Sequence, residues 1–333
     1  MMRNILIVGP AWIGDMVMAQ SLFRLLKQIH PKATIDVIAP AWSKPLLARM
    51  PEIQEAIELP FAHGVFKPLQ RIRLGQSLRD RQYDWAITLP ITWKSALVPF
   101  GAKIKKRTGF KGEMRYALLN DMRILDKKRL PMMVQRYLAL GLDPDASIPD
   151  NFLKPKLLSS AQQQQIAMQA MGLSRDKKIL GICPGAEYGP AKRWPVEYFA
   201  DVGNAMIKKG WQVWLFGSEK DNPTTNAICE SIGQGSINLA GRTQLDQAID
   251  LLACCQHVLC NDSGLMHISA ALGVQVSAIF GSSDIHYTPP LNDNAQMISL
   301  QLECSPCFKK ECPLGHYNCL KQIKPETVLA TIN

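Results

Sequence analysis

The sequence predicts an α/β protein made of two doubly wound units, and three observations support this class. A chain of 333 residues is long for a single hydrophobic core and is a typical length for two domains. Short apolar runs alternate with segments of helical periodicity, which is typical of parallel βαβ units. This pattern stops and restarts around Pro144, Pro149 and Pro155. We therefore expect one domain over residues 1–155 and a second over residues 156–333.

The first half begins with a βαβ unit. The apolar, β-branched run at residues 4–9 indicates a buried parallel strand, and residues 10–15 form a turn. Residues 16–29 then have the periodicity of an amphipathic helix. Further along we expect strands at 35–39, 56–59 and 85–88, helices at 68–81 and 132–140, and a loop with a short helix at 91–102.

The turn after the first strand places a carboxylate where α/β proteins bind ligands. The segment 9–14 is followed by Asp15 and not by Lys-Ser/Thr, so it is no Walker A loop, and the G-x-G-x-x-G fingerprint is absent. Asp15 would stand at the carboxyl end of the first strand, which is the ligand-binding edge of open sheets. It is either a functional carboxylate or an acid that complements the helix dipole.

The second half repeats the alternation of strand and helix. We expect strands at 179–183, 212–216, 236–238, 258–260 and 276–280, and helices at 161–171, 196–209, 224–232, 245–252 and 265–272.

Four of these strands end in turns that suit an anionic ligand. In a parallel sheet the turns share one edge, where glycines and hydroxyl residues form amide-rich concavities for phosphate. Lys192 can neutralise phosphate charge, and Glu219 suits sugar hydroxyls. We therefore predict a nucleotide-diphosphate ligand at this edge, near Gly185, Ala186, Gly217, Ser218, Gly241, Asp262, Ser263 and Gly264.

The turn at 261–264 leads from a strand into a helix. Asp262 or Ser263 can cap that helix, and Gly264 lets the backbone approach a ligand closely. The orphan amides and the helix dipole both favour negative charge. An ordinary capped βα turn is the alternative reading of the same residues.

Charge is divided unevenly between the halves. The net charge is +10, yet residues 1–160 carry 25 Lys+Arg against 13 Asp+Glu, whereas residues 161–333 carry 13 against 15. The excess is densest at 103–129. The basic half suits nucleic acid, an anionic membrane face or a phosphorylated glycolipid, or is simply a solvated face.

The composition also narrows the cellular setting that we expect. The longest apolar runs are strand-sized, far below the ~20 residues that span a bilayer. The N-terminus lacks the features of a secretory signal, so we expect a cytoplasmic protein whose nine cysteines are free thiols or metal ligands.

Five segments, taken in order, resemble the bacterial ADP-heptose:lipopolysaccharide heptosyltransferases, which are glycosyltransferases of family 9. They are Ile-Gly-Asp at 13–15, Pro-Gly-Ala…Lys-Arg-Trp-Pro at 184–195, Phe-Gly-Ser at 216–218, Asn-Leu-Ala-Gly-Arg-Thr at 238–243 and Asn-Asp-Ser-Gly-Leu-Met-His at 261–267. The resemblance extends over nearly the whole chain. It implies the GT-B architecture, in which two Rossmann-like domains face each other across a cleft. Residues 1–155 would then bind the acceptor and residues 156–333 the nucleotide-sugar donor.

The resemblance further implies an inverting, metal-independent transfer from ADP-L-glycero-D-manno-heptose. The family's general base falls on Asp15, and its phosphate-contacting lysine falls on Lys192. The family's donor-contacting segment falls on Asp262, Ser263, Gly264, Leu265 and His267. His267 would either reach the donor or be a histidine of the core.

A cysteine-rich tail resembles the heptosyltransferase II branch of this family, which adds heptose to the first heptose of the inner core. Zinc ligation is an alternative role for these thiols, but their spacing is not that of paired C-x2-C knuckles, so we expect no metal site. The cysteines are Cys304, Cys307, Cys312 and Cys319.

The resemblance also implies the partners. No cofactor would be required beyond the donor, and the acceptor would be heptosyl-Kdo2-lipid A. The basic half would meet the anionic inner membrane peripherally, at its cytoplasmic face. The alternatives are the heptosyltransferase I branch, acting on Kdo-lipid A, and a basic nucleic-acid-binding protein. For the latter the sequence has no RNP, zinc-finger or helix-turn-helix signature, so we expect no nucleic acid partner.

Overall fold

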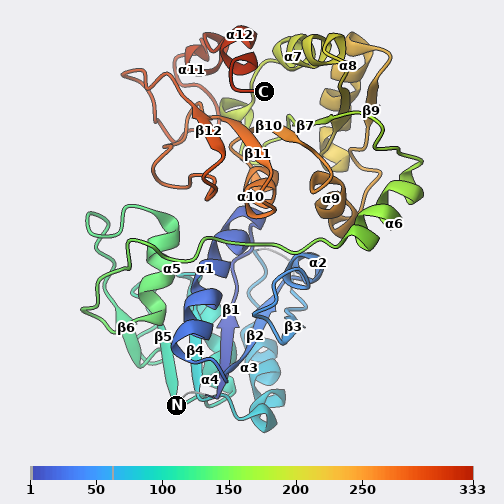
Figure 1. Cartoon of the computed structure of the whole chain (residues 1–333). Coiled ribbons are helices and arrows are strands. Elements are labelled where there is room, and N and C mark those ends of the chain that lie inside the picture. Colours follow the sequence, from blue (N-terminus) through green and yellow to red (C-terminus); the bar gives the residue numbers. More distant parts are fainter. Residues whose placement is uncertain (1–2, 62–63, 333) are drawn as a thin grey trace. The chain divides into compact units, whose positions relative to one another are not determined.

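A computed structural model of the chain describes residues 3–61 and 64–332. The chain divides into two compact units, residues 1–155 and 156–333 (Figure 1). Each unit contains one six-stranded parallel sheet with helices packed around it.

In the first unit the strand order is β3-β2-β1-β4-β5-β6. The neighbouring strands pair in parallel, with Ile5 opposite Ile35 on one side and opposite Trp85 on the other. The elements are β1 (Asn4–Val8), α1 (Ile13–Ile29), β2 (Thr34–Ala39), η1 (Ala41–Ser43), α2 (Lys44–Leu47), β3 (Glu55–Glu58), α3 (Pro68–Ser77), η2 (Arg79–Arg81), β4 (Trp85–Thr88), η3 (Trp93–Ala96), α4 (Leu97–Gly101), β5 (Lys106–Phe110), β6 (Asp121–Arg123) and α5 (Met133–Gly141), where η denotes a 3₁₀ turn.

The second unit repeats this topology, with the order β12-β11-β10-β7-β8-β9. In each unit the strand order reverses beside the first strand, between β1 and β4 and between β7 and β10. Ligands of doubly wound sheets bind at the carboxyl end of such a switch point. The elements are α6 (Ala161–Met171), β7 (Ile179–Cys183), η4 (Pro190–Lys192), α7 (Val196–Lys208), β8 (Gln212–Leu215), η5 (Glu219–Asp221), α8 (Asn222–Ile232), β9 (Ser236–Asn238), α9 (Leu245–Leu252), β10 (His257–Asn261), α10 (Gly264–Ala271), β11 (Gln275–Ile279), β12 (Ala295–Ile298), α11 (Asn318–Lys321) and α12 (Pro325–Leu329).

The structure corrects several sequence-based boundaries. Helix α1 begins at Ile13, three residues before the predicted start, because Trp12 is the extended N-cap residue and its carbonyl accepts the Met16 amide. No strand was predicted at β5, β6 or β12. Strand β5 begins with two half-buried cationic residues, and β6 is a short, half-buried edge strand. Neither segment therefore has the alternation or run of apolar residues that predicts a strand.

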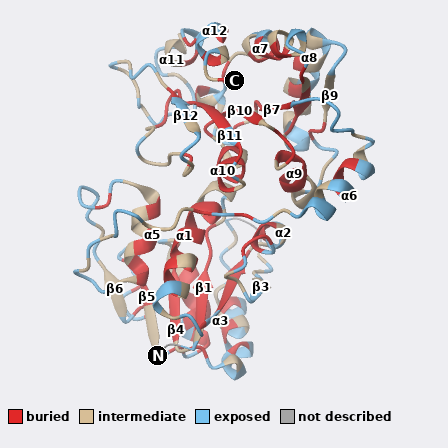
Figure 2. Cartoon of the chain, viewed as in Figure 1, coloured by how far each residue is buried: buried red, intermediate tan, exposed pale blue. Residues whose placement is uncertain are grey.

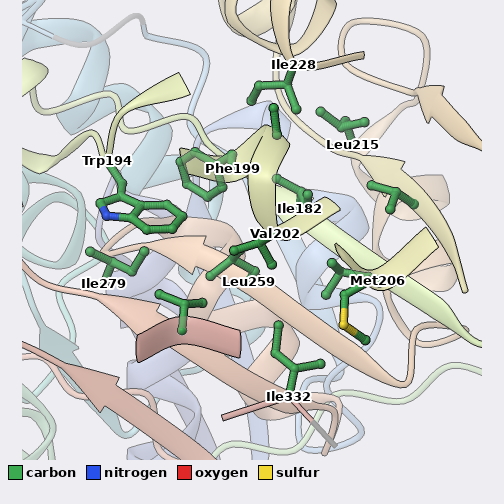
Figure 3. Close-up of a cluster of buried hydrophobic side chains, with 14 of the residues drawn as sticks. Ile182, Trp194, Phe199, Val202, Met206, Leu215, Ile228, Leu259, Ile279 and Ile332 are labelled. Carbon is green, nitrogen blue, oxygen red and sulfur yellow. The ribbon is translucent and has the colours of Figure 1, made fainter. Parts of the chain in front are cut away.

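The core of the second unit anchors the segment that leads out of β7. Trp194 is 2% exposed and packs edge-on against Phe199, with 5.0 Å between the ring centroids (Figure 3). Its indole Nε1 donates a 3.0 Å hydrogen bond to the Ile323 carbonyl. Figure 2 shows that the central strands and the inner helical faces are buried. Because Trp194 is held in this core, the position of the residues just before it is fixed at the sheet edge.

Candidate functional site

Asn261, the last residue of β10, connects the two strands at the switch point of the second unit. Its side-chain Oδ1 accepts a 3.1 Å hydrogen bond from the Trp194 amide, and its Nδ2 donates a 2.6 Å bond to the Pro184 carbonyl. Asn261 is fully buried. This one amide therefore holds both ends of the β7–α7 loop against β10, and Asn261 is a site residue that was not predicted from the sequence.

A charged pair lies at this switch point. Lys192 Nζ donates to Asp262 Oδ2, and the side chains are 18% and 5% exposed. The Lys192 ammonium also stands 5.2 Å from the centre of the Tyr188 ring. The structure thus brings together two predicted site residues that are 70 positions apart in the chain.

Ser283 is a third member of this arrangement that sequence reasoning missed. Its hydroxyl donates a 2.5 Å hydrogen bond to the same Asp262 oxygen. Ser283 is 8% exposed and lies in the turn after β11, which is a fifth loop at the same sheet edge. The signal that could have located it is the Gly-Ser-Ser sequence at 281–283, directly after the predicted strand.

The N-terminus of α10 supplies backbone donors beside the charged pair. Ser263 is the N-cap residue in an extended conformation, and its side chain makes no capping bond. The Ser263 hydroxyl oxygen is buried and has no hydrogen-bond partner among the described residues. Gly264 and Leu265 begin the helix, and the first amides of an α-helix have no partner within it. This end of α10 therefore favours an anion.

His267 lies in the same helix and is buried, with 5% exposure. Burial lowers the pKa of His267 to about 4, the Asp262 carboxylate opposes that shift, and Lys192 adds to it. The imidazole is therefore neutral at physiological pH, close to the charged pair.

The loops after β7 and β8 are packed around Asp221, another residue that the sequence analysis did not select. A side chain at Gly185 would overlap the Asp221 carboxylate, and one at Gly217 would come within 2.7 Å of its Cβ. Both the amide and the hydroxyl of Ser218 donate 2.8 Å hydrogen bonds to Asp221 Oδ2. Gly185 and Gly217 thus leave room for the Asp221 carboxylate, and Ser218 is hydrogen-bonded to that carboxylate.

The remaining predicted residues of this edge are Gly241, Glu219 and Ala186. Gly241 has φ +69°, and a Cβ there would come within 3.0 Å of the Glu219 backbone, so these two loops meet. Glu219 is exposed. Ala186 is buried, and its carbonyl accepts hydrogen bonds of 3.2 and 3.0 Å from the Arg193 guanidinium.

The cysteine-rich tail is hydrogen-bonded to the loops that carry Lys192 and Ser283. The Ala191 amide donates to the Lys310 carbonyl at 3.0 Å, and the Phe308 amide donates to the Ser282 carbonyl at 2.7 Å. The Tyr188 hydroxyl donates to the Phe308 carbonyl at 2.6 Å. The tail is therefore part of the framework that positions the charged pair.

The four tail cysteines are free thiols around a small cavity. The cavity measures about 20 Å³, and His316 and Ser282 also line it. Burial raises the pKa of Cys319, as do the thiols of Cys304, Cys312 and Cys307. Within residues 3–61 and 64–332, no three His, Cys, Asp or Glu side chains are arranged to hold a metal ion.

In the first unit, Asp15 is the third residue of α1 and is half-buried. Helix α1 follows β1, so this carboxylate stands beyond the carboxyl end of a strand at that unit's switch point. This is the placement that the sequence predicted for Asp15, and its chemical role stays a prediction.

One residue of the predicted basic region is not available to a partner. Arg115 is 1% exposed and donates to the carbonyls of Pro90 and Phe110. Burial lowers its pKa to about 10. Its charge therefore serves the protein's own loops, whereas Lys103, Lys105, Lys111, Lys127, Lys128 and Arg129 are exposed.

This chain is similar over nearly its whole length to solved and sequenced glycosyltransferases. A structure of Escherichia coli ADP-heptose LPS heptosyltransferase II superposes with a TM-score of 0.90 at 44% identity, over 99% of this chain and 97% of that one. The predicted GT-B class, with two Rossmann-like units, is thereby confirmed. The model of glycosyltransferase family 9 (heptosyltransferase) matches residues 71–318. The chain belongs to this family and is a glycosyltransferase.

Two curated relatives are similar over almost their whole length. Lipopolysaccharide heptosyltransferase 2 of E. coli K12 is 46% identical over 99% of this chain and 97% of its own. Lipooligosaccharide heptosyltransferase 2 of Haemophilus influenzae is 47% identical over 99% and 98%. Among the described residues, no helix combines the length and apolar composition that crossing a bilayer requires.

Proposed function

We propose that this protein transfers heptose from ADP-L-glycero-D-manno-heptose to the first heptose of the lipopolysaccharide inner core, with heptosyl-Kdo2-lipid A as acceptor. The single observation that carries the proposal is the Lys192–Asp262 pair, a half-buried ammonium on a buried carboxylate, at the switch point of the second unit, beside the N-terminus of α10. Relatives named for this activity are 46% and 47% identical over nearly the full chain, which supports the same acceptor.

The charge that develops in such a reaction matches the second unit. Attack at an anomeric carbon passes through an oxocarbenium-like state while negative charge grows on the departing diphosphate. Lys192 and the first amides of α10 would meet that charge without a divalent metal. Asp262 holds the ammonium at the sheet edge before the donor arrives, so little reorganisation is needed when the diphosphate binds.

The acceptor half of the reaction is assigned to the first unit. A hydroxyl nucleophile needs a base within hydrogen-bond reach, and Asp15 is the carboxylate at that unit's switch point. Inversion requires the base and the leaving-group stabilisers on opposite faces of the sugar. A base from residues 1–155 and diphosphate-binding groups from residues 156–333 would satisfy that requirement.

A transfer assay tests this function and separates the two branches of the family. Purified protein is incubated with ADP-heptose and with core acceptors that carry zero or one heptose, and the products are read by mass spectrometry. We expect one added heptose on the acceptor that already carries one. Addition to the acceptor with none would instead assign the protein to the heptosyltransferase I branch, and no addition to either would refute the proposal.

The proposed acceptor is a glycolipid, which a membrane surface would carry. We propose peripheral association with the cytoplasmic face of the inner membrane, supported by the cationic excess of the first unit. Because such attraction is screened by salt, high ionic strength should release the protein from isolated membranes. Membranes that keep the protein in high salt and release it only to detergent would contradict this mode of association.

A further inference from the structure

Two of the most exposed large apolar side chains in the described structure lie among the cations of the first unit. Ile124 is 83% exposed and Met114 is 82% exposed, and Tyr116 is 59% exposed between them in sequence. Single exposed apolar residues are ordinary, but a group of them flanked by lysines marks an interaction surface.

Backbone contacts bring these residues to one edge of the sheet. Strands β5 and β6 pair in parallel with Phe110 opposite Arg123, and the Lys111 amide donates a 2.6 Å hydrogen bond to the Arg123 carbonyl. The segments leading to Met114 and from Arg123 to Ile124 therefore leave the sheet side by side. Lys127, Lys128 and Arg129 follow a few residues later and are exposed.

Arg115 anchors the loop that carries Met114 and Tyr116 by hydrogen bonds to neighbouring segments. This buried guanidinium donates to the Pro90 carbonyl at 2.8 Å and to the Ser95 hydroxyl at 3.2 Å. The Glu113 amide donates to the Ile91 carbonyl at 3.3 Å, and Ile91 is itself 55% exposed. The apolar tips are thus presented on an anchored loop, so binding would cost little additional ordering of the chain.

The acidic residues within this surface are turned toward the protein's own backbone. Glu113 Oε2 accepts a 2.6 Å hydrogen bond from the Trp93 amide. Asp126 Oδ1 accepts the amides of Lys128 and Arg129 at 2.8 and 3.1 Å. Backbone amides thus engage one oxygen of each of these two exposed carboxylates, and the four cations Lys111, Lys127, Lys128 and Arg129 outnumber them.

We propose that this surface, defined as Ile91, Lys111, Met114, Tyr116, Ile124, Lys127, Lys128 and Arg129, docks on an anionic lipid bilayer, with Met114 and Ile124 inserted at the headgroup level. The inference deepens the proposed function, because it rests on the acceptor being a membrane glycolipid. Exposed apolar side chains close in sequence to exposed cations match a surface whose negative charge overlies hydrocarbon. Neither contribution suffices alone: one short apolar insertion gives marginal binding, and charge attraction is lost in salt.

Vesicle co-sedimentation tests the surface without donor or acceptor. Purified full-length protein is mixed with vesicles of phosphatidylglycerol and phosphatidylethanolamine, or of phosphatidylcholine alone, at ~0.15 M salt. We expect binding to the anionic vesicles only. Met114→Ser/Ile124→Ser should weaken that binding by about tenfold or more, since burying one such side chain is worth roughly tenfold or more in partitioning. Lys127→Ser/Lys128→Ser should weaken it and flatten its salt dependence.

The matched control is Ile166→Ser, which removes a 58% exposed isoleucine from the glutamine-rich helix α6. We expect it to bind vesicles as the unaltered protein does, and all variants should bind ADP normally, which shows that they are folded. Unchanged vesicle binding by Met114→Ser/Ile124→Ser, an equal loss in Ile166→Ser, or equal binding to neutral vesicles would overturn the inference. The transfer assay with detergent-dispersed acceptor tests the proposed function separately, so the two can fail independently.

Discussion

Ser283→Ala is expected to weaken nucleotide binding through Lys192, although Ser283 itself is not assigned to the donor. The serine hydroxyl donates a 2.5 Å hydrogen bond to Asp262 Oδ2, which is also the oxygen that accepts Lys192 Nζ. Both Ser283 and Asp262 are more than nine-tenths buried. Removing the hydroxyl would free the carboxylate to rotate and would leave the ammonium less firmly placed for the diphosphate.

The expected magnitude follows from the type of bond. A hydrogen bond to a charged group contributes about 1.5–3 kcal/mol. Part of this loss would appear in the free energy of unfolding and part in affinity, so we expect the dissociation constant for ADP to rise about tenfold, or ~1.4 kcal/mol. Isothermal titration calorimetry with ADP measures it directly, and Ser283→Thr, which keeps the hydroxyl, should restore most of the affinity.

Two comparisons separate positioning from a general loss of stability. On a Lys192→Ala background, Ser283→Ala should cost no further affinity, because the group through which it acts is gone. The matched control is Ser277→Ala on β11, which removes a buried hydroxyl that contacts His257 Nε2 at 2.8 Å and lies away from the charged pair. It should lower stability and leave ADP affinity intact. A tenfold loss that persists without Lys192, or that appears equally in Ser277→Ala, would refute the reasoning.

Three further outcomes follow from the structure and the proposed reaction. Asp15→Ala should keep ADP binding and lower turnover by ~100-fold or more if Asp15 is the base, and near-normal turnover in a steady-state assay would exclude that role. Burial lowers the pKa of His257 and of His267 to about 4. Because the unfolded chain binds these protons from about pH 6.5 downward, stability should fall between about pH 6.5 and 4, by up to roughly 3 kcal/mol for each histidine. His257→Gln should flatten that decline in urea titrations, and an identical slope would contradict the assignment. A chelator should leave turnover unchanged, since Lys192 and the α10 amides supply the positive charge; loss of activity restored by added metal would show otherwise.

Local pattern alone determined much of the fold. Strand β7 (Ile179–Cys183), strand β9 (Ser236–Asn238) and helices α6 (Ala161–Met171) and α9 (Leu245–Leu252) have the limits that periodicity and flanking turns predicted. The chemistry of a buried strand or an amphipathic helix is encoded within a few consecutive residues, so it can be read without knowing the neighbours. The same applies to the two-unit organisation, because repeated βα alternation already implies parallel sheets.

The assembly of the site depends on how distant strands pack together. Ser283, Asp262 and Lys192 are far apart in the chain, and they meet because the ends of non-consecutive parallel strands share one edge of the sheet. Arg115 shows the converse, since nothing in a run of basic residues distinguishes the cation that is buried under a loop from those that face outward. The order of strands and turns predicts that Lys192 and Asp262 share a sheet edge, but which partner each polar group binds depends on contacts between distant segments.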